Sequence, residues 1–136
     1  GSEVCIRDRR NYHWNVKGQC IFVMHSEYEE LDNDAAEKFD EVAERILQLG
    51  STPESRFSVY LQTAEIKEAD VVSCSKEALD LLLDYYKTLI ARERRIIEVA
   101  SEAHDDTTVS LVSDFLKEQE KTVWMLVAVS SQSCAE

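Results

Sequence analysis

The strongest constraint on the fold is one long helical pattern of apolar residues. Between Ile21 and Leu49, apolar side chains recur at steps of three or four residues, the spacing of one face of an α-helix. Gly50 and then Pro53 follow, which is typical of the end of a helix. About thirty residues at about 1.5 Å each make a helix of roughly 43 Å. A chain with so long a helix must be organised by helix packing.

Two further long helices are predicted in the second half of the chain. One begins near Ser75, a plausible cap, and carries a leucine-rich stripe, and the other follows the polar break at 104–107. Residues 51–74 form a connection between the first two long helices. A short helix in this connection is predicted to carry Phe57, Tyr60 and Leu61.

The scarcity of turn residues supports an all-α fold. Only three glycines and one proline occur in 136 residues, so sandwiches, barrels and propellers are excluded. The length suits one domain. The sequence predicts a four-helix bundle with a short helix in the middle connection. Its first helix is truncated, since only Arg9 to Val16, about two turns, is left to form it.

The charge of the chain limits its partners. Fifteen Lys and Arg stand against 27 Asp and Glu, giving a net charge of −12. Such a chain repels nucleic acid and anionic membranes and attracts cations. No apolar run approaches the roughly 18 residues of a membrane span. Four scattered cysteines without a C-x-x-C pair favour reduced thiols in a cytoplasmic protein. Buried structural thiols are expected for Cys20 and Cys74, and for Cys134 near the C-terminus the alternative is an exposed thiol.

Histidines and carboxylates recur at spacings that suit a metal site. His25 lies twelve residues after His13 and four before Glu29, with which it shares a helix face. Asp40 and Glu44 form a second pair at the same spacing. Imidazole and carboxylate ligands together suit iron or a similar divalent metal. The alternative for the carboxylates is a solvated helix face.

These two pairs cannot meet on one helix. Glu29 and Asp40 differ by about 20° around the axis but by roughly 16 Å along it, and His25 and Asp40 by roughly 22 Å. Two copies can join them if their helices pack antiparallel about a two-fold axis near residues 34–35. The sequence also lacks the Glu-x-x-His motif of di-iron sites built within one subunit.

The residues around these ligands resemble the Dps family of mini-ferritins. The similarity rests on Asn-Tyr-His-Trp-Asn-Val-Lys-Gly at 11–18, His25, and Asp-Glu-Val-Ala-Glu-Arg-Ile at 40–46, and it extends over about residues 11–131. It implies a ferritin-like bundle and a shell of about twelve subunits built from dimers. It also implies a ferroxidase that oxidises two ferrous ions per inter-subunit site with hydrogen peroxide, stores ferric mineral and protects against oxidative stress.

The resemblance also assigns roles to individual residues. His13, His25 and Glu29 of one chain would bind iron together with Asp40 and Glu44 of its dimer mate. Glu29 falls where many family members carry aspartate.

Other residues are given roles outside the ligand set. Trp14 would lie beside the site and intercept oxidising equivalents, the alternative being plain packing. Asp105, Asp106 and Asp114 would line an acidic pore that attracts ferrous ions, the alternative being capping of the last helix by Asp105 and Thr107.

The N-terminal region departs from the family pattern. Residues 1–10 are expected to be a non-native or disordered segment ahead of a ferritin-like domain at 11–136. Family members normally carry a full first helix before the His-Trp-Asn motif. Two alternatives to a ferroxidase therefore remain: a DNA-coating nucleoid protein, and a helical assembly module that the truncation has left without chemistry. Direct DNA binding is not expected, because the chain is acidic and no basic tail is present.

Overall fold

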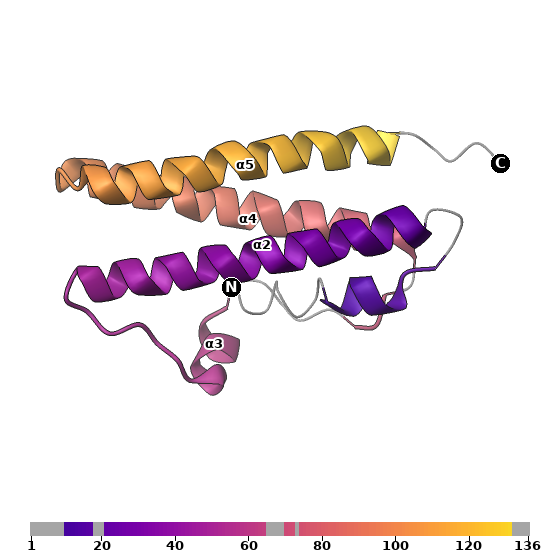
Figure 1. Ribbon diagram of the computed structural model, residues 1–136, viewed down its shortest axis with the longest axis horizontal. Coiled ribbons are helices and arrows are strands. Elements are labelled where there is room, and N and C mark those ends of the chain that lie inside the picture. Colours follow the sequence, from indigo (N-terminus) through magenta and orange to yellow (C-terminus); the bar gives the residue numbers. More distant parts are fainter. Residues whose placement is uncertain (1–9, 18–20, 65–69, 73, 132–136) are drawn as a thin grey trace. The chain divides into compact units, whose positions relative to one another are not determined.

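The computed structural model describes residues 10–17, 21–64, 70–72 and 74–131. Its long helices are α2 (Ile21–Gln48), α4 (Ser75–Glu102) and α5 (Asp106–Ser131), with the short α3 (Phe57–Thr63) between the first two (Figure 1). A further short helix covers residues 10–15. This confirms the predicted all-α class and the helix in the middle connection. The chain forms two compact units, Gly1–Ala78 and Leu79–Glu136.

The end of α2 follows the predicted stop signal. Gly50 has a φ of 82°, a backbone conformation that glycine adopts without steric cost. Its N–H donates to the carbonyl of Leu47 at 2.9 Å, and the N–H of Ser51 donates to that of Ile46 at 3.0 Å. These two bonds satisfy carbonyls that the helix end leaves open. The glycine therefore fixes where α2 ends.

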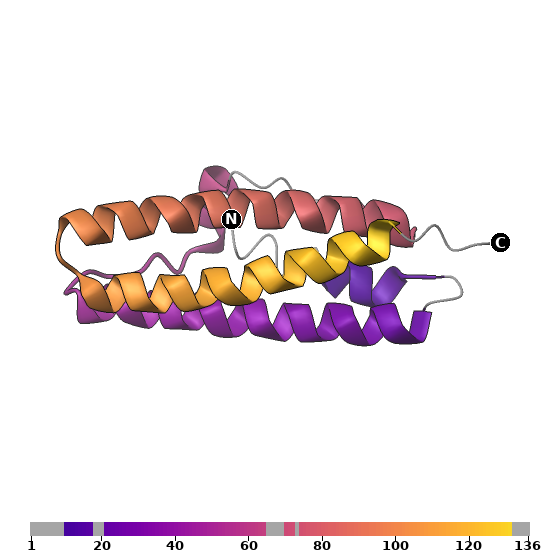
Figure 2. The ribbon, with the colours of Figure 1, turned by 90° about the horizontal axis from the view of Figure 1, so that it is seen from above.

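The short helix at residues 10–15 lies beside the first turns of α2 (Figure 2). Tyr12 and Tyr28 are fully buried, and their rings meet edge to face with centroids 5.9 Å apart. Arg10 places its Nε and one terminal nitrogen 2.9 Å from Oδ2 of the buried Asp32. One aromatic contact and one ion pair thus hold the helix that carries His13 against α2.

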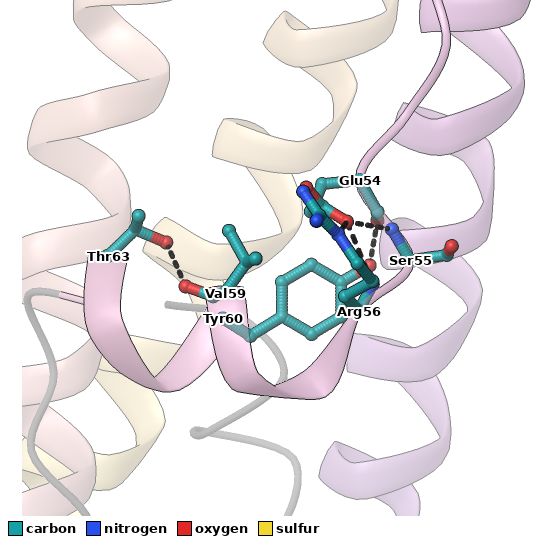
Figure 3. A network of polar contacts seen from close by, with 6 residues as sticks. All are labelled: Glu54, Ser55, Arg56, Val59, Tyr60 and Thr63. Atoms are coloured by element: carbon teal, nitrogen blue, oxygen red, sulfur yellow. Dashed lines mark hydrogen bonds and ion pairs between the residues drawn. The ribbon is translucent and has the colours of Figure 1, made fainter.

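The connection after α2 is organised around Glu54 (Figure 3). Its carboxylate accepts hydrogen bonds from the backbone N–H of Ser55 and Arg56 and from the Arg56 guanidinium, at 2.7–3.0 Å. The hydroxyl of Tyr60 donates to the Glu54 carbonyl. The Tyr60 ring also meets Phe39 of α2 edge to face, with centroids 6.0 Å apart. This network ties α3 to α2.

In the second unit, α4 and α5 form an antiparallel hairpin (Figures 1 and 2). His104, in the turn, has a φ of 56°, which is uncommon for a residue other than glycine. Gln119 donates to Glu93 at 2.6 Å, and Arg94 pairs with Glu120 at 3.0 Å. Two polar links therefore cross the hairpin at neighbouring positions on both helices.

One further sequence-based expectation is contradicted by the structure, and another lies mostly outside the described residues. Cys74 is a free thiol but is exposed, so the prediction that it is buried was wrong. The predicted N-terminal segment lies outside the described residues except for Arg10, which is helical. None of the described helices is long and apolar enough to cross a membrane.

Loss of Arg10 should destabilise the protein. The Asp32 side chain is 7% exposed, so Arg10→Ala would leave a buried carboxylate without its cation. We expect a loss of about 1–3 kcal/mol, less than for a fully buried pair because the Arg10 side chain is 53% exposed. Urea unfolding measures this loss of unfolding free energy. Arg95→Ala is the matched control, because both side chains of the Arg95–Glu98 pair are exposed. Equal losses in the two variants would contradict the role of Arg10.

The Glu54 network should titrate at unusually low pH. The hydrogen bond from Arg56 is the main reason that the pKa of Glu54 falls from 4.5 to about 2. The contribution of this group to stability is therefore complete above about pH 4.5 and is lost as the pH falls towards 2. Carbon-detected NMR of the Glu54 carboxyl should give a midpoint near 2. Arg56→Gln should raise the midpoint towards 4.5, and a wild-type midpoint already at that value would refute the network.

Candidate metal centre

The centre begins with two histidines that clamp each other. His13 comes from the short helix and His25 from the second turn of α2, and their rings stack with centroids 3.7 Å apart and planes at 26°. Nδ1 of His13 lies 2.8 Å from the carbonyl oxygen of His25. Nδ1 of His25 lies 2.7 Å from the carbonyl oxygen of His13. The clamp is therefore reciprocal and uses backbone acceptors on both sides.

The clamp determines which ring nitrogens can bind a metal. A carbonyl oxygen only accepts hydrogen bonds, so each Nδ1 must carry a proton and donate it. In a neutral ring the lone pair then lies on Nε2, and metal-binding histidines are commonly oriented through their other nitrogen in this way. His25 is exposed and His13 is partly exposed. The structure thus presents two Nε2 lone pairs in one place.

The predicted carboxylate ligands lie along the exposed surface of α2. Glu29 is one helical turn beyond His25, while Asp40 and Glu44 lie near the other end. All three are exposed. With a rise of about 1.5 Å per residue, Asp40 is roughly 22 Å from His25 along the axis. Within the described ranges, no three His, Cys, Asp or Glu side chains are close enough together to hold a metal ion.

The surroundings of the histidine pair are apolar on one side and open on the other. Tyr12 directly precedes His13, Tyr28 lies three residues after His25, and both tyrosines are buried in the core. Burial raises the pKa of Tyr28 to about 12. The phenol of Tyr28 therefore stays protonated at neutral pH. Trp14, which was predicted to lie beside the site, is 70% exposed. Its role in oxidation chemistry stays a prediction.

The predicted pore residues divide into two groups. Asp105 caps α5: its carboxylate accepts hydrogen bonds from the backbone N–H of Thr108, at 3.1 Å, and from the Thr108 hydroxyl. Capping by Asp105 is therefore confirmed, and its assignment to a pore stays a prediction. Asp106 in the first turn and Asp114 two turns later are both exposed. Whether they line a pore depends on neighbouring copies, so that assignment stays a prediction.

Sequence reasoning missed two features that build this centre. Asp32 lies on the buried stripe of α2, and a charged residue at such a position signals a partner of opposite charge; that partner is Arg10. The backbone clamp of the two histidines gave no such signal. It depends on where two chain segments cross, and the intervening residues do not encode that position in a recognisable pattern.

Comparison with known proteins supports the assignment of the fold. The family model for the ferritin-like domain matches residues 9–132. The DNA protection during starvation protein of Porphyromonas gingivalis is 48% identical over 130 residues, which cover 96% of this chain and 82% of that protein.

Solved structures agree with the sequence relatives. The crystal structure of the Dps protein from Vibrio cholerae, described as a ferritin-like diiron-carboxylate protein, aligns with a TM-score of 0.91 and 41% identity over 93% of this chain and 80% of that one. Dps from Staphylococcus aureus aligns with a TM-score of 0.92 and 29% identity over 97% of this chain and 89% of that one. The all-α ferritin-like four-helix fold is thereby established, and the chain belongs to the Dps family of mini-ferritins.

Proposed function

We propose that this protein is a ferroxidase that oxidises ferrous ions and stores the ferric product, protecting its cell against oxidative damage. The observation that carries the proposal is the His13–His25 clamp, which presents two Nε2 lone pairs one helical turn before the exposed Glu29 of α2. Imidazole and carboxylate together suit ferrous iron. The family relationship and the diiron-carboxylate description of the Vibrio cholerae relative support the same metal.

The site is proposed to lie between two copies of the chain. His13, His25 and Glu29 from one copy would face Asp40 and Glu44 from the other. An antiparallel pairing of two α2 helices about an axis near residues 34–35 brings these groups together, and it creates two equivalent sites per dimer. The separation of roughly 22 Å within one helix is the reason that a second copy is required.

The proposed reaction uses iron as substrate and hydrogen peroxide as oxidant. Two ferrous ions held together give one electron each to a peroxide molecule, which becomes two hydroxide ions. Because both electrons are delivered to the same peroxide, no hydroxyl radical is released. The carboxylates stabilise the ferric product by their charge, and the histidines keep their orientation through the backbone bonds.

Further assembly is proposed on the same grounds. Dimers would form a hollow shell of about twelve subunits, with Asp106 and Asp114 attracting ferrous ions towards its interior. The proposal includes the predicted cytoplasmic location. The names of relatives that refer to DNA protection leave a DNA-coating role as the alternative. A net charge of −12 opposes direct coating.

Stopped-flow absorbance after mixing with ferrous iron and peroxide tests the proposal. The assembled fraction from a sizing column should show a fast oxidation phase that saturates near two irons per site. Asp40→Ala should slow this phase at least about tenfold, since even indirect damage to a metal site costs about 10–100-fold. Glu41→Ala is the matched control, because Glu41 is an equally exposed neighbour on another face of α2.

Two results would contradict the ferroxidase. Oxidation no faster than in buffer would favour a helical assembly module without chemistry. Equal rates for the Asp40→Ala and Glu41→Ala variants would show that Asp40 is not a ligand of the proposed site. The DNA-coating alternative predicts instead a complex with duplex DNA whose affinity falls steeply as salt is raised.

A further inference from the structure

The exposed surface of α2 carries more than metal ligands. Phe22 lies three residues before His25, and Leu47 lies three residues after Glu44. At about 100° per residue, the two apolar residues and the ligands of α2 fall within an arc of about 100° on the helix surface. From end to end this stripe reads Phe22, His25, Glu29, Asp40, Glu44 and Leu47.

Both ends of the stripe are unusually open to solvent. The Phe22 side chain is 89% exposed, the largest fraction among the large apolar side chains that the structure describes. Leu47 is 58% exposed. Covering such side chains with another apolar surface removes them from water, which is energetically favourable.

The spacing of the stripe points to a second copy of the chain as the surface that covers Phe22 and Leu47. An antiparallel copy of α2, with the two-fold axis between residues 34 and 35, sets His25 opposite Glu44 and Glu29 opposite Asp40 of the second copy. The same register sets Phe22 opposite Leu47. Near the axis, the exposed Asn33 and Ala36 face each other, and their short side chains permit close approach of the two helices.

We propose that Phe22 of one chain packs against Leu47 of a second copy and closes the outer end of each metal site. The inference rests on the proposed inter-subunit ferroxidase and adds the pair that determines its register. Phe22 and Leu47 are positioning residues: their contact keeps His25 facing Glu44 and excludes water from one side of the carboxylates. A closed outer end strengthens the electrostatic attraction between the site and its cations.

Site-directed crosslinking tests the register directly. Phe22→Cys and Leu47→Cys are introduced together into the full chain, with the four native cysteines changed to serine: Cys5, Cys20, Cys74 and Cys134. The assembled protein is treated with a short bismaleimide and separated on a denaturing gel. Positions 22 and 47 lie roughly 38 Å apart along one helix, so a crosslink between them must join two chains. We expect a covalent dimer as the main product.

Matched variants identify the register. Val23→Cys with Leu49→Cys is the control pair, because these residues are 63% and 58% exposed but lie outside the arc. It should stay monomeric on the gel. Each single variant, Phe22→Cys or Leu47→Cys, should also stay monomeric, since identical positions lie at opposite ends of an antiparallel pair. Mixing the two single variants and reassembling them should restore the crosslinked dimer.

The outcomes separate this inference from the function on which it rests. Equal crosslinking of the control pair, or of either single variant, would overturn the proposed register. An assembled protein that oxidises iron rapidly but gives no 22–47 crosslink would overturn the Phe22–Leu47 contact and leave the ferroxidase intact. A chain that neither assembles nor crosslinks would overturn both.

Discussion

The fixed rise of the α-helix is the constraint on which the other features depend. It places His25 and Glu29 at one end of α2 and Asp40 and Glu44 at the other, too far apart for one chain to join. A chain that uses all of them must therefore present its ligands on an open face. The structure agrees with this requirement, since His25, Glu29, Asp40 and Glu44 are exposed. Met24, Tyr28 and Asp32 of the same helix are buried.

Much of the fold could be predicted because it depends on local patterns. The apolar period predicted α2, and Gly50 predicted its end, because the required backbone angle is one that glycine adopts readily. The polar break before α5 likewise contains its cap, Asp105. Residue types and spacings also identified the metal-binding candidates, since an i, i+4 pair shares a face in any helix.

The remaining features depend on contacts between distant segments. The exchange of hydrogen bonds between His13 and His25 requires that a short helix cross α2 at one particular turn. The pairing of Arg10 with Asp32 requires the same crossing, and the Glu54 network requires the path of the connection to α3. No spacing rule encodes these positions. Contacts between subunits are harder still to predict from the sequence, because they depend on how two folded copies of the chain pack against each other.

The division of the ligands between the two ends of α2 has a genetic consequence. In the proposed two-fold dimer, one site would take its histidines from the first chain and its Asp40 from the second, and the other site would take the reverse. A chain that lacks His25 and a chain that lacks Asp40 would each be inactive alone. When the two are paired, both defects fall in one site and the other is assembled from intact halves. Two null alleles of this gene would then complement each other within a single cell.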